Sequence, residues 1–135
     1  MTNTTWTRTV PLRWRDFDPL GHMYHGEYLA LFDEVRTPFL DELVLDGTDY
    51  SYVLGRIEID YVSEIAHGTA KTVDVEVTVQ RIGSKSIRTR EVMRRPDGEV
   101  AARIEAVSVL WDPEARGSAA LTDAQRAALE PYLEG

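Results

Sequence analysis

Residues 13–36 read RWRDFDPLGHMYHGEYLALFDEVR, and the arrangement of the whole chain follows from this stretch. Its second half predicts a long helix, because apolar side chains recur at the three- and four-residue steps of one helical face: Tyr28, Phe32, Val35, Phe39 and Leu43. So wide an apolar face needs a large partner, such as a sheet. Pro38 lies inside the pattern and lacks an N–H, so we expect a kink or two abutting helices within about 26–44.

Length and composition limit the possible classes of protein. The chain has 135 residues and 43% hydrophobic residues, which predicts one domain spanning 1–135 with a core of its own. The formal net charge of −8 argues against nucleic acid and anionic membranes as general partners. The absence of cysteine excludes disulfides and thiolate chemistry. With no signal-like or membrane-spanning apolar run, we expect a cytoplasmic chain without membrane insertion.

Alternating apolar and polar residues predict strands on both sides of the helix. Val73, Val75, Val77 and Val79 give the clearest period of two, with Asp, Glu, Thr and Gln after them in turn. Similar patterns and the turn residues between them predict five strands, at about 9–14, 56–61, 73–80, 85–95 and 99–111. Thr122 and Gln125 form a capping-box pattern for a short C-terminal helix. The order predicts an α+β fold, a five-stranded antiparallel sheet wrapped around one long helix.

The segment before the helix holds two candidate carboxylates. Asp18 precedes Pro19, which favours an extended conformation in a loop beside the helix N-terminus. A carboxylate there is suited to act as a nucleophile or as a general base on water, and it is equally suited to cap a turn. Asp16 continues the alternation of Val10, Leu12 and Trp14, so we place it at the end of the first strand in a structural role.

Histidine and basic residues supply further candidates. His25 could orient Asp18, bond a carbonyl or move a proton, or it could simply satisfy loop backbone groups. Asp18, His22 and His25 could suggest a metal site, but no further ligand cluster accompanies them, and we expect no metal; His67 is taken as incidental. A basic group could bind nucleotide phosphates or form an exposed strand face with surface ion pairs: Arg81, Lys85, Arg88 and Arg90. No dinucleotide-binding, phosphate-loop or serine-hydrolase motif is present.

The segment DFDPLGHMYHGEYLALFDEVR resembles the signature of hotdog-fold acyl-CoA thioesterases of the 4-hydroxybenzoyl-CoA thioesterase type. The likeness covers roughly residues 8–112, and Tyr24-His25 is similar to the branch associated with the bacterial Tol-Pal system. The family's pattern implies that Asp18 is catalytic with His25 beside it, and that Tyr24 and Gly26 lie where the thioester carbonyl is polarised. It also implies coenzyme A contacts from a group of four residues: Arg81, Ser84, Lys85 and Arg88. Many relatives carry an asparagine-rich loop where this chain has Gly21–His25.

The resemblance implies hydrolysis of an acyl-CoA or acyl carrier protein thioester, with Asp18 as nucleophile or base. Coenzyme A would enter only as part of the substrate, and no other cofactor is expected. A hotdog hydratase or dehydratase is the enzymatic alternative, and a non-catalytic acyl-CoA binding module is the other. A homodimer or homotetramer is expected, because one sheet wrapped on one helix leaves edges unpaired and the family's sites lie between subunits.

Overall fold

A computed structural model describes residues 4–134 of the chain. The first strand, β1 (Trp6–Pro11), leads through a single 3-10 turn (Trp14–Asp16) into helix α1 (His25–Leu40). Four strands follow, which are β2 (Ser51–Tyr61), β3 (Thr72–Ile82), β4 (Ser86–Arg94) and β5 (Val100–Asp112). A two-residue strand β6 (Gly117–Ser118), helix α2 (Asp123–Leu129) and a 3-10 turn (Glu130–Tyr132) complete the described chain.

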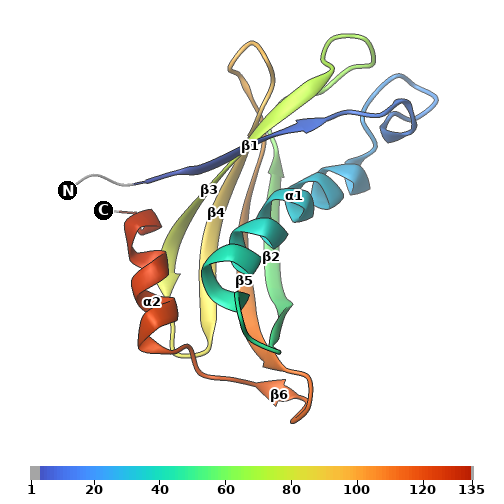
Figure 1. Cartoon of the computed structure of the whole chain (residues 1–135). Helices are drawn as coiled ribbons and strands as arrows, with labels where there is room; N and C mark the ends of the chain where they lie inside the picture. The colour runs from blue at the N-terminus through green and yellow to red at the C-terminus, as the bar shows by residue number, and fades with distance from the viewer. Residues whose placement is uncertain (1–3, 135) are drawn as a thin grey trace.

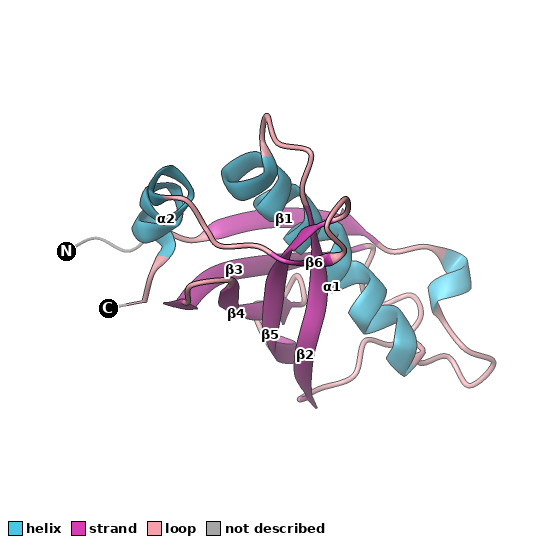
Figure 2. Ribbon diagram, turned by 90° about the horizontal axis from the view of Figure 1, so that it is seen from below, coloured by secondary structure: helices cyan, strands magenta, loops and turns pink. Residues whose placement is uncertain are grey.

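The strands form one antiparallel sheet in the order β1-β3-β4-β5-β2, with β6 pairing to β5. Figure 1 shows the sheet curving around α1, and Figure 2 shows α2 at the β1 and β3 side. The predicted antiparallel sheet, long helix and short C-terminal helix are therefore confirmed. Strand β2 lies at one edge of the sheet, opposite β1.

The core forms where the apolar face of α1 meets the valines of β3. Phe32, Val35 and Phe39 are fully buried, as are Val75, Val77 and Val79. The alternation in β3 explains this, because successive strand side chains point to opposite faces and only one face meets the helix. From the C-terminal segment, Tyr132 lies edge-on to the rings of Trp6 and Phe39 and closes the core at the β1 side.

Pro38 lies inside α1, and the chain continues through a π-helical segment (Asp41–Leu45) before the turn that leads into β2. Proline cannot donate to the helical ladder, so a change of winding one turn later accords with the predicted interruption. The first strand begins and ends three residues earlier than predicted. It ends at Pro11, and Trp14 is 83% exposed rather than facing the core.

Two ionised residues in the core were not predicted. The side chains of Arg36 on α1 and Glu91 on β4 are both fully buried. Arg36 donates from Nε and Nη2 to the two oxygens of Glu91 at 2.8 and 2.9 Å. Thr89 donates its hydroxyl to the same carboxylate at 2.6 Å. Burial raises the pKa of Glu91, whereas the arginine beside it acts in the opposite sense.

Candidate active site

The two aspartates of the loop before α1 have different environments. Asp16 is fully buried and lies in the 3-10 turn, not at the end of the first strand. Its carboxylate accepts from the Arg13 amide at 2.7 Å and from the guanidinium of the same residue at 3.1 and 3.2 Å. Both oxygens are engaged, so Asp16 closes its own 3-10 turn onto Arg13, the residue that caps it. The predicted place of Asp16 at the end of the first strand was wrong, and its structural role stays a prediction.

Asp18 begins a tight loop that its own side chain closes. One carboxylate oxygen, Oδ1, accepts from the amides of Leu20 at 2.9 Å and His22 at 3.2 Å. Gly21 has a φ of 83°, a value that glycine adopts without strain and that permits this reversal. Within residues 4–134, the second oxygen of Asp18 accepts no hydrogen bond. The turn therefore fixes the position of the carboxylate and leaves one oxygen for another partner.

The segment after β2 holds this loop in place. Met23 donates its amide to the Ile65 carbonyl at 3.0 Å, and His67 donates its amide to the Gly21 carbonyl at 2.7 Å. The ring of His67 also lies edge-on to Phe17 at 5.1 Å between centroids. His67, expected to be incidental, thus supports the aspartate loop.

A pocket of about 470 Å³ opens between the aspartate loop and the His67 segment. Its lining residues are Trp14, Phe17, Asp18, Pro19, Gly21 and His67. The predicted carboxylate therefore borders a mostly apolar hollow, which can receive an apolar group next to an ionisable one.

The N-terminus of α1 lies close to this loop and has no side-chain cap. Tyr24 occupies the N-cap position, and its side chain makes no capping hydrogen bond. Instead the tyrosine ring lies over Gly26, where an added Cβ would come within 2.7 Å of Tyr24 Cε2. In the described part of the chain, the amides of His25 and Gly26 donate to no acceptor, so they remain available to an anionic oxygen.

His25 and Asp18 do not touch each other in the structure. No hydrogen bond between them is present within residues 4–134, and the His25 ring lies against Tyr24 at 4.4 Å between centroids. Tyr61, at the end of β2, donates its hydroxyl to the His25 carbonyl at 3.0 Å. His22 is not among the residues that line the pocket, and its Nδ1 lies 2.5 Å from a Glu64 carboxylate oxygen. Across the described residues, no group of three or more histidine and acidic side chains is arranged to hold a metal ion.

Three of the four predicted coenzyme A residues line one hollow at the β3–β4 turn. This hollow has a volume of about 470 Å³, and Arg81, Ser84 and Arg88 line it, whereas Lys85 is exposed beside it. Arg81 and Arg88 are directly paired across β3 and β4, so two cations face one small space. Of these two, Arg88 has a carboxylate neighbour, Glu105, at 3.9 Å.

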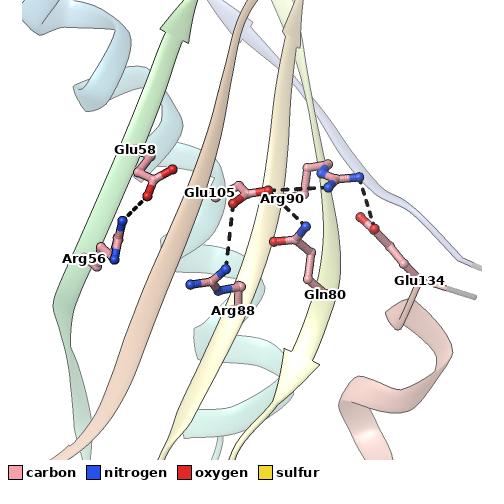
Figure 3. A network of polar contacts seen from close by, with 7 residues as sticks. All are labelled: Arg56, Glu58, Gln80, Arg88, Arg90, Glu105 and Glu134. Carbon is pink, nitrogen blue, oxygen red and sulfur yellow. Dashed lines mark hydrogen bonds and ion pairs between the residues drawn. The ribbon is translucent and has the colours of Figure 1, made fainter.

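Figure 3 shows that Glu105 belongs to a polar network on the sheet face away from α1. Glu105 accepts from Gln80 at 3.1 Å and from Arg90 at 3.4 Å, and Arg90 also pairs with Glu134 at 3.2 Å. Hydrogen bonds from Gln80 and Arg90 lower the pKa of Glu105. Arg90 is therefore part of a surface ion-pair network. For this residue the structure agrees with the second of the two interpretations of the basic group, an exposed strand face with surface ion pairs.

The two halves of the predicted site lie at opposite ends of one sheet. Tyr61 meets the start of α1 at one end of β2, while Val53 lies level with Val109 and Ser86, next to the β3–β4 turn. The eight residue steps from Val53 to Tyr61 span about 26 Å at about 3.3 Å per residue. A single chain therefore keeps the aspartate loop and the basic hollow well apart.

The curved antiparallel sheet around a long helix is the hotdog fold. The chain belongs to the Thioesterase-like superfamily, whose sequence model matches residues 12–129. Among curated proteins no match is found. In the described residues, no helix is long and apolar enough to cross a membrane.

Solved structures with the same fold include proteins bound to coenzyme A. A hypothetical protein of Staphylococcus aureus in complex with CoA is 18% identical with a TM-score of 0.86, covering 100% of this chain and 89% of that one. A Thermus thermophilus thioesterase complexed with coenzyme A and Zn is 28% identical with a TM-score of 0.79, covering 91% and 95%. A 1,4-dihydroxy-2-naphthoyl-CoA thioesterase from Synechocystis is 17% identical with a TM-score of 0.77, covering 93% and 96%.

Proposed function

We propose that this chain hydrolyses an acyl-CoA thioester and that Asp18 carries the reaction. The observation behind the proposal is the set of contacts that the Asp18 carboxylate makes. Its own loop binds one oxygen through two amides, the other oxygen has no partner within residues 4–134, and the group borders a mostly apolar pocket. The similarity of its loop to thioesterases of the 4-hydroxybenzoyl-CoA type, with the Tyr-His pair of the Tol-Pal-associated branch, supports the same residue.

Two routes use this carboxylate. As a general base, Asp18 removes a proton from water, and the resulting hydroxide attacks the thioester carbonyl. As a nucleophile, Asp18 attacks the carbonyl itself, and water then hydrolyses the mixed anhydride. In both routes the C–S bond breaks, the sulfur leaves as the coenzyme A thiol after protonation, and the acyl group leaves as the acid.

The uncapped start of α1 can stabilise the negative charge that develops on the thioester oxygen during the reaction. The carbonyl oxygen gains negative charge in the transition state, and the amides of His25 and Gly26 are free donors at the positive end of a 16-residue helix. The Tyr24 ring over Gly26 and the His25 ring beside it would border the bound thioester. In this proposal they position the substrate rather than bond to Asp18.

A complete site in this proposal needs two chains. Strand β2 is an edge strand with apolar side chains 39–48% exposed along and just beyond it, among them Val53, Leu54, Tyr61 and Val62. If two copies pair these edges antiparallel about Ile57, Tyr61 of one copy lies opposite Val53 of the other. That arrangement brings the aspartate loop of one subunit toward the basic hollow of its partner.

The test is release of free thiol from a panel of acyl-CoAs by the purified full chain. The chain has no cysteine, so the protein adds no background to a thiol reagent. Asp18→Asn should fold normally and lose at least about a hundredfold in kcat, the low end for a general acid–base group. Asp16→Asn should lower the melting temperature, because its bonds to Arg13 weaken, and should keep most of the turnover of the folded protein.

The outcomes separate the alternatives. Near-wild-type turnover by Asp18→Asn would remove Asp18 from the mechanism. Binding of CoA without thiol release from any substrate would favour a binding module, and hydration of an unsaturated acyl-CoA without thiol release would favour a hydratase.

A further inference from the structure

The β3–β4 turn is held by a side chain from α2, far along the sequence. Arg126 donates from Nη1 to the Gly83 carbonyl at 2.6 Å and from Nη2 to the Ile82 carbonyl at 3.4 Å. The guanidinium is half-buried, and its two donors hold two successive carbonyls. This planar fork suits adjacent acceptors, which a lysine ammonium would contact as a single point.

Backbone bonds fix the next two carbonyls of the same turn. Leu121, just before α2, donates its amide to the Ser84 carbonyl at 2.9 Å. Leu110 of β5 donates its amide to the Lys85 carbonyl at 2.9 Å. All four carbonyls from residue 82 to residue 85 are thus bound by other parts of the chain.

These bonds determine where the amides of the turn point. No peptide bond among the described residues is cis, and in a trans peptide the N–H points opposite to the C=O of the preceding residue. By holding the Gly83 carbonyl, Arg126 therefore directs the Ser84 N–H away from α2, and the bond from Leu121 does the same for the Lys85 N–H. In the part of the chain that the structure describes, these two amides donate to no acceptor.

The two free amides belong to the turn beside the hollow that Arg81 and Arg88 line. Neighbouring N–H groups next to two cations form an environment that favours a phosphate oxygen. Gly83 allows the tight turn, because an added Cβ would lie 2.9 Å from Ser86 Oγ.

We infer that Arg126 is a positioning residue for coenzyme A: it orients the β3–β4 turn so that the Ser84 and Lys85 amides meet a phosphate of the nucleotide. The inference rests on the proposed function in taking coenzyme A as the thiol carrier. Arg126 acts through the backbone and does not touch the acyl group or Asp18.

The experiment compares Arg126→Met with Gln125→Leu. Gln125 is the adjacent residue of α2 and also bonds a backbone carbonyl, Val44, at 2.8 Å, but it does not reach the turn. Calorimetry measures the Kd for CoA, and kinetics compare an acyl-CoA with the matching acyl-pantetheine, which lacks the nucleotide phosphates. Arg126→Met should weaken CoA binding and raise KM for the acyl-CoA by about tenfold, the scale of one charge-assisted hydrogen bond, and spare kcat.

Acyl-pantetheine should be hydrolysed by Arg126→Met as by the wild type, and Gln125→Leu should bind CoA normally even if its melting temperature falls. Arg126→Lys should recover only part of the affinity, since an ammonium cannot hold both carbonyls. Unchanged CoA affinity in Arg126→Met, an equal loss in Gln125→Leu, or full recovery in Arg126→Lys would each overturn the inference.

The proposed function has a separate point of failure. A wild-type chain that binds CoA but hydrolyses no thioester overturns the reaction, while the Kd comparison still decides the role of Arg126. A wild-type chain that binds no CoA overturns the inference itself.

Discussion

Replacing Glu91 with leucine should destabilise the chain severely, although the change makes the core more apolar. Arg36 would remain fully buried with Asp33 as its one ionised partner, and the Asp33 side chain is 58% exposed. Removing one member of a buried ion pair costs about 3–5 kcal/mol, because the remaining charge is desolvated without compensation. For a chain of this length 1 kcal/mol corresponds to about 3.5 °C, so the melting temperature should fall by about 10–18 °C.

The stability of the complementary variant, Arg36→Met, should depend on pH. Burial raises the pKa of Glu91, and without the arginine only the smaller opposing effect of the hydrogen bond from Thr89 remains. The unfolded chain then releases the Glu91 proton at a lower pH than the folded chain does. The variant should therefore be most stable at acidic pH and lose up to about 1.4 kcal/mol per pH unit until pH passes the folded-state pKa. Glu91→Leu has no such group, so its free energy of unfolding should not show this fall as the pH rises.

Removing both charges tests the reasoning. Arg36→Met with Glu91→Leu leaves no buried charge at this position but deprives the Thr89 hydroxyl of its acceptor, so Thr89→Val completes the set. The triple variant should lie within about 2 kcal/mol of the wild type, since apolar replacements of buried pairs are often neutral. Urea unfolding followed by tryptophan fluorescence at a fixed protein concentration measures all four proteins. A triple variant as unstable as Glu91→Leu would refute the argument from an uncompensated charge.

Two further predictions concern the site and its assembly. Gly26→Ala should displace the Tyr24 ring from the start of α1 and lower kcat, while alanine's helix preference of up to about 1 kcal/mol keeps the melting temperature from falling; a large stability loss would contradict this. Light scattering at micromolar concentration should show a dimer or tetramer, and Leu54→Lys, on the exposed β2 edge, should give an inactive monomer. A stable, active wild-type monomer would exclude a shared site.

The elements with clear periodicity were the ones that the sequence predicted best. The valines of β3 and the apolar steps of α1 are regular because each element buries a single continuous face. The first strand was predicted three residues too far along the chain, since Leu12 and Trp14 continue the alternation while the chain has already left the sheet at Pro11. The two-residue β6 is too short to produce a pattern.

Contacts between residues far apart in the sequence limited how much of the site could be predicted. The role of Asp18 in a turn follows from its neighbours Pro19 and Gly21, and the sequence anticipated it. The pairing of Arg36 with Glu91 could not be predicted from the sequence. Two polar residues 55 positions apart look solvent-exposed until the fold places them together. The bonds from Arg126 to the β3–β4 turn were missed for the same reason, since they join residues more than 40 positions apart.

The sheet order has a consequence for how the chain is made. β3, β4 and β5 follow one another as neighbours, so each finds its partner soon after synthesis. β1 and β2 are different, because their partners come much later in the chain: Trp6 pairs with Val77 after 71 more residues have been added, and Tyr52 with Leu110 after 58. At a synthesis rate of about 5–20 residues per second, β2 waits for several seconds with both edges open and its apolar side chains exposed. Of these two late-pairing strands, β2 is the longer, with 11 residues against 6, and is therefore the more exposed to aggregation on the ribosome.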